Sequence, residues 1–283
     1  KEFIPIIEKE SDRKLNKGFG ICYVPDFVAL GNVIEDFYVP DLLLIGESDK
    51  KAGDIVESIY MNMIISSPKI VRTSIINVEL TKILFNNFLT TKISFANMIG
   101  NLCDKIEGSD ANVITNAIGY DRRISPLYMK RGYRFGGNCF PRDTKAYISL
   151  ANKYGCDTNL IDSVDEINNN QDDLLMVDIL KDSPEIISIL GLAFKPNTPV
   201  ITESPAIKLI DNLKGIDIKI KVYDDLAMKE VKSIYGDRLI YCDSIKECIK
   251  DTDTCVITLP SDKFKNLKFD KSTTLIDYWN LYA

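Results

Sequence analysis

The sequence predicts an α/β protein with a helical middle and a C-terminal, doubly wound parallel sheet. Three observations support this prediction. From residue 183 onward, short apolar runs alternate with helical segments, which is the pattern of parallel strands joined by crossover helices. Between residues 77 and 107, apolar residues recur at helical spacing with no glycine before Gly100. Near the N-terminus, two short apolar runs are typical of buried strands.

The first region, residues 1–46, is predicted to begin with a short helix and to continue in strands. The helix is expected in the charged stretch KEFIPIIEKESDRK, which lacks the features of a secretory signal. The two apolar runs are FGICYV and PDLLLIG. Both are short and bounded by Gly or Pro, as strands usually are.

The middle region, residues 47–182, is predicted to be almost entirely helical. Its longest helical pattern covers residues 77–107, and two more cover residues 143–154 and 158–180. Asp143 is a candidate cap, because a carboxylate can accept the free backbone N–H groups at a helix start. The NNNQDD stretch inside the last pattern is poor helix material.

The C-terminal region, residues 183–283, is predicted to form the parallel sheet. Ser204 and Pro205 supply a cap and a first helical position for a helix in SPAIKLIDNL. The other expected elements are strand EIISILGLAF, strand IKIKVYDD, helix AMKEVKSIY, strand RLIYCD, helix SIKECIK, and strands TCVITLP and TTLIDYW. Ligands of such sheets bind beyond the carboxyl ends of the strands, so GLAFKPNT and VYDD are candidate ligand edges.

Composition excludes several classes of protein. The chain has 283 residues, a formal net charge of −6, seven Cys and no His. An acidic chain of this kind is not expected to bind nucleic acid, and no apolar run approaches the length of a membrane span. The odd number of Cys, with no C-x-x-C pair, predicts no disulfide framework and no metal site, and indicates a reducing, cytoplasmic compartment. Without His, covalent catalysis must use Lys, Asp or Glu as partners.

The stretch GGNCFPRD contains the first candidate for chemistry, Cys139. Gly136 and Gly137 allow the backbone to approach a ligand closely, and Asp143 follows Cys139 by four residues. Cys139 is therefore a candidate nucleophile with an acidic partner. The alternative is a buried filler, which is the usual state of a free Cys.

The stretch ELTKILFNN contains a second candidate pair, Lys82 and Asn86. The two residues are four apart, so they share one face of the predicted helix, on a stripe that is otherwise apolar. A buried Lys with an amide neighbour can polarise water or stabilise an oxyanion. The alternative is an ordinary solvated helix face.

Two basic features suggest an anionic ligand such as a phosphate. The basic residues that lead into the glycine loop are Arg122, Arg123, Lys130, Arg131 and Arg134. In an acidic protein this local excess favours an anion site, although surface charge explains it equally well. Lys195 follows a predicted strand end, where it can reach a phosphate or a sugar hydroxyl or be an ordinary loop residue.

Several longer motifs follow one another along nearly the whole chain. They are VPDFVALG with PDLLLIG, ELTKILFNNFLTTKISFANMIG, DRRI, GGNCFPRD, GLAFKPNTPVITESPAIKLI and IDYWN. In this order they resemble the UDP-glucose and GDP-mannose dehydrogenase family of nucleotide-sugar dehydrogenases. FPRD and ESPA favour UDP-glucose over N-acetylated sugars.

The resemblance implies three domains and an NAD-dependent reaction. Residues 1–46 are expected to be a remnant of an NAD-binding Rossmann domain, residues 47–182 a central domain that forms a homodimer, and residues 183–283 a Rossmann-like domain that binds the UDP-sugar. In the family's reaction, a sugar C6 alcohol is oxidised twice to a carboxylate. The second oxidation passes through a cysteine thiohemiacetal and thioester, and two NAD are reduced.

The resemblance also implies a role for each catalytic residue. Cys139 would be the nucleophile, and Lys82 and Asn86 would stabilise the developing oxyanion and position water. Asp143 would hold or activate that water. Asp26, in place of the family's Glu, would contribute to thioester hydrolysis.

A second set of residues is implied in binding. Arg123 would reach the sugar site of a neighbouring subunit, and Arg142 would lie near the cofactor. The substrate-binding residues expected from the resemblance are Phe27, Arg123, Tyr128, Lys130, Gly132, Gly136, Phe194 and Lys195.

The sequence departs from the family pattern in its cofactor-binding features. It contains no G-x-G-x-x-G, so we expect most of the NAD-binding domain to be missing and NAD binding to be weak. Leu30 and Thr202 replace polar residues near the cofactor, and Arg134 replaces a Gly of the sugar loop, where it would disturb the loop or contact phosphate. A shortened enzyme and a short paralogue both explain these departures. The paralogue would be a non-catalytic nucleotide-sugar-binding or scaffold protein.

Overall fold

The computed structural model describes residues 2–282, which divide into two compact units. The first unit is Lys1–Phe85 and the second is Asn86–Ala283. Each is described by itself.

The first unit contains a three-stranded sheet in the order β1-β2-β3. Its elements are α1 (Phe3–Ser11), β1 (Cys22–Tyr23), α2 (Val33–Tyr38), β2 (Leu42–Glu47), α3 (Lys50–Met63), β3 (Lys69–Ser74) and the start of α4 (Ile75–Cys103). β2 and β3 are parallel, in register from the pair Leu42↔Lys69 to the pair Glu47↔Ser74, whereas β1 is antiparallel to β2. Leu43, Ile45 and Ile64 form the buried centre of this unit.

The strand β3 lies in a region that the sequence predicts to be helical, and that prediction is wrong here. Its residues KIVRTS include three β-branched side chains, Ile70, Val71 and Thr73, which favour the extended conformation. Each residue of β3 pairs with a residue of β2. The run was too short to be distinguished from a helical segment by periodicity alone.

The three long helices of the second unit agree with the sequence predictions to within a few residues, whereas α5 (Ala111–Gly119) was not predicted as a separate helix. The helical part of this unit consists of α4 from Asn86 onward, α5, α6 (Phe140–Lys153) and α7 (Asn159–Leu180). The α7 helix continues through NNNQDD, where Asn168 and Gln171 face inward and are buried. Asp143 is not the cap of α6, because that helix begins at Phe140 and the N-cap position is Cys139.

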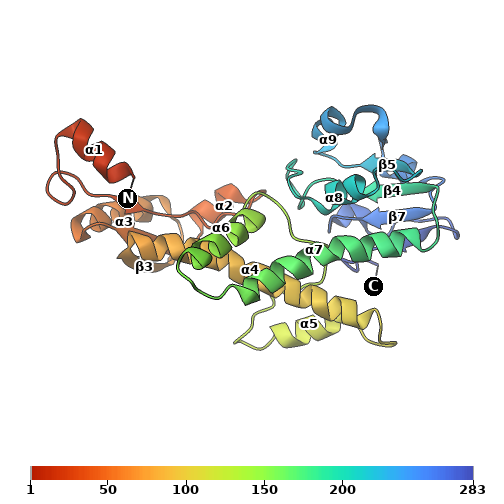
Figure 1. Ribbon diagram of the computed structural model, residues 1–283, viewed down its shortest axis with the longest axis horizontal. Helices are drawn as coiled ribbons and strands as arrows, with labels where there is room; N and C mark the ends of the chain where they lie inside the picture. The colour runs from red at the N-terminus through yellow and green to blue at the C-terminus, as the bar shows by residue number, and fades with distance from the viewer. Residues whose placement is uncertain (1, 283) are drawn as a thin grey trace. The chain divides into compact units, whose positions relative to one another are not determined.

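The C-terminal part of the second unit is a five-stranded sheet in the order β6-β5-β4-β7-β8, with every pair parallel. Its elements, drawn in teal to blue in Figure 1, are β4 (Ile186–Leu190), α8 (Pro205–Asn212), β5 (Lys219–Tyr223), α9 (Met228–Tyr235), η1 (Gly236–Arg238), β6 (Ile240–Tyr241), α10 (Ile245–Ile249), β7 (Thr254–Ile257), η2 (Asp262–Phe264) and β8 (Thr274–Ile276). This sheet confirms the predicted α/β fold class. Ser204 caps α8 by accepting from Ile207 N, as predicted.

The strand order reverses direction between β4 and β7, which are neighbours in the sheet. Ile187, Ile189, Val222 and Val256 are fully buried at its centre, so the strand ends are held in fixed positions. Ligands of open parallel sheets bind at such a switch point, beyond the carboxyl ends of the strands. The segment GLAFKPNT leaves β4 there. Among residues 2–282, no helix is long and apolar enough to cross a membrane.

Candidate active site

The glycine-containing loop 132–137 is buried and held by two side-chain amides. Asn97 of α4 accepts from Gly132 N at 2.9 Å and donates to Tyr133 O at 3.2 Å. Asn168 of α7 binds both backbone groups of Phe135, since it accepts from Phe135 N at 2.7 Å and donates to Phe135 O at 3.2 Å. Buried backbone N–H and C=O groups need hydrogen-bond partners, and this loop does not lie in a sheet. The two Asn side chains supply partners for four of its backbone groups.

A second loop, residues 191–204, packs directly against the first. Gly137 N donates to Thr202 O at 2.9 Å. A Cβ on Gly136 would lie 2.0 Å from Glu203 O, and a Cβ on Gly137 would lie 2.6 Å from the Phe194 ring. Gly137 also has a φ of +81°, so both glycines are required by the close approach of the two loops. The predicted ligand edge GLAFKPNT therefore lies against the predicted glycine loop.

The second loop is itself held by a buried carboxylate at the end of β5. Asp224 Oδ2 accepts from Leu192 N at 2.7 Å and from Ala193 N at 3.2 Å. Its Oδ1 accepts from the N–H groups of Leu226 and Ala227, each at 2.8 Å. One side chain thus joins the carboxyl ends of β4 and β5, and it fixes the backbone that leads to Phe194.

Cys139 is a free, exposed thiol immediately before α6. Its carbonyl accepts from Asp143 N at 2.9 Å, which closes the first turn of the helix. The exposure removes the alternative of a buried filler. The partial positive charge at a helix N-terminus favours an anion at this position.

Asp143 is buried in the first turn of α6, with only 4% of its surface exposed. Its carboxylate accepts from Asn86 Nδ2 at 2.5 Å and from Arg142 Nε at 2.9 Å. The structure therefore brings three predicted site residues, Asn86, Asp143 and Arg142, into one hydrogen-bonded group. Asn86 does not lie on a solvated helix face, because only 7% of its surface is exposed.

Lys82, Asp26 and Phe27 form a group in the first unit. Lys82 Nζ donates to Asp26 O at 2.6 Å and lies 4.6 Å from the centroid of the Phe27 ring. The Phe27 ring also packs edge-on against Phe85, with centroids 5.0 Å apart. The ammonium thus has a cation–π contact and a carbonyl contact, while the Asp26 residue is exposed.

The predicted basic cluster is largely neutralised by acidic partners. Arg123 is exposed and pairs with Asp121, whose pKa is lowered by the hydrogen bonds from Arg123. Arg131 pairs with Asp104, and Arg134 pairs with Asp172 and Glu203. Three of the five basic residues thus have acidic partners, and the anion site remains a prediction.

The other predicted binding residues lie in the two loops or in the segment 128–131 just before the glycine loop. Tyr128 is exposed and has a φ of +62°, and Lys130 is exposed two residues later. Gly132 leaves room for Trp279, since a Cβ there would lie 2.1 Å from the indole. Lys195 is half-buried directly after Phe194.

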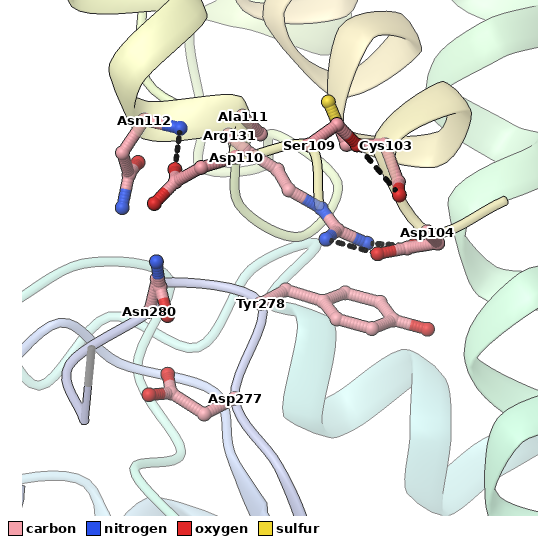
Figure 2. Close-up of a pocket in the computed structure, with 10 residues that line it drawn as sticks. All are labelled: Cys103, Asp104, Ser109, Asp110, Ala111, Asn112, Arg131, Asp277, Tyr278 and Asn280. Carbon is pink, nitrogen blue, oxygen red and sulfur yellow. Dashed lines mark hydrogen bonds and ion pairs between the residues drawn. The ribbon is translucent and has the colours of Figure 1, made fainter. Parts of the chain in front are cut away.

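A cavity of about 270 Å³ opens beside Arg131 (Figure 2). Its lining residues are Cys103, Asp104, Ser109, Asp110, Ala111, Asn112, Arg131, Asp277, Tyr278 and Asn280. Figure 2 shows the Arg131 guanidinium beside Asp104, and its carbon lies 4.6 Å from the centroid of the Tyr278 ring. Burial raises the pKa of Asp277. Of the predicted clusters, only the basic one contributes a residue to this cavity.

Asn97 and Asn168 were not among the predicted site residues, and Asp224 was named only as part of the candidate ligand edge VYDD. Each is a polar residue at a position that the helical or strand pattern would assign to the interior. A buried polar residue generally marks a specific hydrogen-bonding task. That signal was present in NNNQDD, which was instead interpreted as weak helix material.

Comparison with known proteins places the chain in one family. Models of the UDP-glucose/GDP-mannose dehydrogenase family match residues 1–64 (NAD binding domain), 77–170 (central domain) and 188–283 (UDP binding domain). The chain belongs to this family. The expectation that most of the NAD-binding domain is missing is not borne out, because that domain's model matches residues 1–64. The predicted boundaries after residues 46 and 182 remain predictions.

Individual relatives agree with this assignment. The chain is 32% identical over 275 residues to UDP-glucose 6-dehydrogenase TuaD of Bacillus subtilis, and the match covers 96% of this chain and 58% of the relative. It is 35% identical over 237 residues to UDP-glucose 6-dehydrogenase YwqF of the same organism, covering 82% of this chain and 53% of the relative. The chain thus spans less than two thirds of these relatives.

The fold is also similar to that of solved structures. A UDP-glucose dehydrogenase from the hyperthermophilic archaeon Pyrobaculum islandicum superposes with a TM-score of 0.86 at 27% identity, covering 96% of this chain and 63% of that chain. A UDP-D-ManNAc dehydrogenase from Pyrococcus horikoshii superposes with a TM-score of 0.82 at 21% identity, covering 100% and 66% of the two chains, and shows the fold alone.

NAD is supported as the cofactor by the match to the NAD-binding domain model. The described residues nevertheless offer no glycine-rich turn for its pyrophosphate. The α3 helix follows β2 and is capped by Asp49, whose carboxylate accepts from Ala52 N at 3.0 Å. A carboxylate already fills this helix N-terminus and disfavours a second anion there. We assign no NAD contact to this turn.

Proposed function

We propose that the protein takes part in the NAD-dependent oxidation of a UDP-sugar, with UDP-glucose as the substrate, through the thiol of Cys139. The observation that carries this proposal is an exposed thiol at the start of α6, followed one helical turn later by a buried, hydrogen-bonded carboxylate. The motifs around both residues are those of the family. When bound, NAD would accept the electrons of each oxidation.

The UDP-sugar would be held between residues 128–132 on one side and Phe194 and Lys195 on the other. Backbone groups of Tyr128 to Gly132, Lys130 among them, are suited to contact the nucleotide, and Gly136 follows in the glycine loop 132–137. Phe194 packs on Gly137, so that Phe194 and Lys195 would close the opposite side. The match of the UDP binding domain model to residues 188–283 supports this assignment. Arg142 would remain on the cofactor side.

The thiol would act on the aldehyde formed from the C6 alcohol. The Cys139 sulfur adds to the carbonyl carbon, and the thiol proton moves to the carbonyl oxygen, which gives a thiohemiacetal. After the second oxidation, water attacks the thioester, and the carboxylate and the free thiol are released. Asp143 would hold that water, with Asn86 fixing the orientation of its carboxylate.

Lys82 and Asp26 are assigned to the same reaction from the family resemblance of their motifs alone. An ammonium that is partly removed from water stabilises a developing oxyanion more strongly than one in bulk solvent. Phe27 would line the sugar while supporting Lys82 through the cation–π contact. Arg123 would extend toward the site of a neighbouring copy, since its side chain is 82% exposed.

A homodimer is part of the proposal. The α4 helix carries an exposed apolar stripe at Phe88, Phe95, Met98 and Leu102. These residues are spaced by seven, three and four, which is the repeat of a seam between two packed helices. A second copy of the chain, presenting the same stripe, would cover it in a two-fold arrangement.

The covalent step can be tested without NAD. The chain is mixed with the 6-aldehyde of UDP-glucose, and the rate of iodoacetamide alkylation is followed at each Cys by peptide mass spectrometry. The proposal predicts strong protection of Cys139 by the aldehyde and none of Cys156, which is also exposed. Equal alkylation of Cys139 with and without the aldehyde would refute the nucleophile assignment.

Overall turnover is tested by NADH formation from NAD and UDP-glucose. Cys139→Ser should abolish turnover while leaving UDP-glucose binding intact. If the unaltered chain binds UDP-glucose but forms no NADH and no aldehyde adduct, the non-catalytic binding function replaces the proposal. Loss of UDP-glucose binding in Cys139→Ser would also contradict it.

A further inference from the structure

Arg134 lies in the middle of the glycine loop, and its guanidinium is buried between two carboxylates. Nη1 lies 2.6 Å from Asp172 Oδ2 of α7, and Nη2 lies 3.3 Å from Glu203 Oε2. Lys208 of α8 lies 3.1 Å from the same oxygen of Glu203. Only 7% of the Arg134 side chain is exposed. Four alternating charges thus connect α7, the glycine loop, the second loop and α8.

This charge chain connects the same two loops that touch through their backbones. Gly136, two residues after Arg134, faces Glu203 O so closely that no Cβ fits between them. The Glu203 side chain meets Arg134, while its carbonyl meets Gly136. Glu203 therefore fixes the spacing of the two loops in two ways. Its carbonyl makes a close steric contact with Gly136, and its carboxylate makes an ion pair with Arg134.

The chemistry of the pair favours a role in geometry over a role in stability. Burying a guanidinium and a carboxylate costs free energy that their attraction only partly returns. Burial raises the pKa of Asp172, even though Arg134 acts in the opposite direction. A guanidinium does, however, hold two carboxylates in fixed directions through its planar fork, which an ammonium cannot do.

From the family resemblance, Arg134 was predicted to disturb the sugar loop or to contact phosphate. In the structure its guanidinium contacts Asp172 and Glu203 instead. The loop backbone on both sides of Arg134 is held by Asn97 and Asn168, and the guanidinium is directed at carboxylates. The Arg134 side chain therefore makes its ion pairs within the protein.

We propose that Arg134 is a positioning residue that sets the separation between the loop leading to Cys139 and the loop carrying Phe194 and Lys195. Its action passes through Glu203, while Asp172 anchors the guanidinium to α7. This inference rests on the proposed function, because it assumes that the segments next to this loop contact hold a UDP-sugar. Arg134 would act without touching the sugar or the reacting atoms, since its guanidinium is buried against carboxylates.

The test measures UDP-glucose affinity by titration calorimetry on the whole chain. Arg134→Met removes the charge and keeps a similar length, and it should weaken binding about tenfold or more. Arg134→Lys should lose less, because an ammonium can keep one of the two ion pairs. The matched control is Arg72→Met, which removes another partly buried Arg that pairs with Glu47, Asp54 and Glu57 in the first unit. The control should lose stability and keep its affinity within about twofold.

A double-variant cycle distinguishes positioning from a general loss of structure. Glu203→Gln should weaken binding as Arg134→Met does, and the combined variant should lose little more, because both act through one contact. Additive losses would overturn the inference. Near-ultraviolet circular dichroism shows whether Arg134→Met folds. If it does not, the affinities of Glu203→Gln and Arg134→Lys are compared instead.

The outcomes separate this inference from the proposed function. If the unaltered chain binds UDP-glucose and Arg134→Met binds it within about twofold as tightly, the positioning role alone is overturned. If the unaltered, folded chain does not bind UDP-glucose, the proposed function fails, and this inference fails with it. Tenfold weaker binding with partial recovery in Arg134→Lys supports both.

Discussion

The contact between Asn86 and Asp143 shows how individual residues shape the site. Asn86 Nδ2 donates to a carboxylate that is 4% exposed, so removing this donor would leave a buried charge with fewer partners. Both residues were predicted as site residues from their types and positions. Their direct contact was not predicted, because they are 57 residues apart in sequence.

Asn86→Leu should therefore lower the free energy of unfolding by about 1–3 kcal/mol, measured by urea denaturation. The matched control on the same helix is Asn77→Leu, since Asn77 is exposed and its side-chain amide donates to the Thr73 hydroxyl rather than to a buried carboxylate. The control should change the free energy by no more than about 0.5 kcal/mol. Equal effects of the two substitutions would show that the Asp143 contact is unimportant.

The thiols divide into reactive and protected groups. Burial raises the pKa of Cys242 and Cys248, and it raises that of Cys255 to about 12. Since the thiolate is the reactive form, these three should resist iodoacetamide at mildly alkaline pH until the protein unfolds, whereas Cys139 and Cys156 should react readily. Peptide mass spectrometry measures the rate at each position. Fast labelling of Cys255 in the folded protein would contradict the assigned burial.

The same raised pKa values give stability a definite pH dependence. The folded state keeps these thiol protons at a pH where the unfolded chain, with thiols near about 8.5, loses them. Their contribution to stability is therefore complete below about pH 8.5 and declines as the pH rises toward the folded pKa values. Urea denaturation at increasing pH should show this decline, and Cys255→Ala should reduce its slope. An unchanged slope would exclude Cys255 as a contributor.

Among the elements, the two packed loops matter most for the proposed function. Sequence patterns predicted the strands and helices around them, and Gly136 was predicted to allow close approach. What it approaches could not be predicted, because the contact with Glu203 depends on tertiary packing. The strand β3 was missed for a related reason, since only its pairing with β2 distinguishes it from a helical run.

Gly136→Ala should separate the two loops and abolish measurable UDP-glucose binding, because its Cβ would lie 2.0 Å from a backbone oxygen. Crowding of this kind typically costs about 1–3 kcal/mol. The control is Gly215→Ala, where φ is +87° but nothing lies within 4 Å of the added Cβ. Gly215→Ala should lower the melting temperature and leave UDP-glucose affinity unchanged. Wild-type affinity in Gly136→Ala would contradict the loop contact.

The apolar stripe on α4 makes a prediction about assembly. Phe95→Glu places a charge at the middle of the stripe, so it should convert a dimer to a monomer in analytical ultracentrifugation. Tyr154→Glu alters an exposed aromatic residue at the end of α6 and should leave the dimer intact. A chain that is already monomeric, or a dimer unaffected by Phe95→Glu, would exclude this seam.

At the scale of the whole molecule, the fold class and the order of the C-terminal elements could be predicted from sequence, because strand and helix periodicities alternate clearly there. The site could be predicted only as separate clusters. Asn97, Asn168 and Asp224 hold the loops through buried hydrogen bonds, and their partners lie far along the chain, so the sequence does not identify them. The absence of a G-x-G-x-x-G suggested a missing domain, yet the domain model matches residues 1–64. A single motif was therefore a poor guide to the extent of that domain.

The central claim is that this chain binds a UDP-sugar between residues 128–132 and the Phe194–Lys195 segment that follows β4. Titration calorimetry of the whole chain with UDP-glucose tests it most directly, with Lys195→Ala as the variant that removes one predicted contact. We predict saturable binding of one UDP-glucose per chain, and weaker binding by Lys195→Ala. A folded chain that shows no binding heat with UDP-glucose at several temperatures would contradict it.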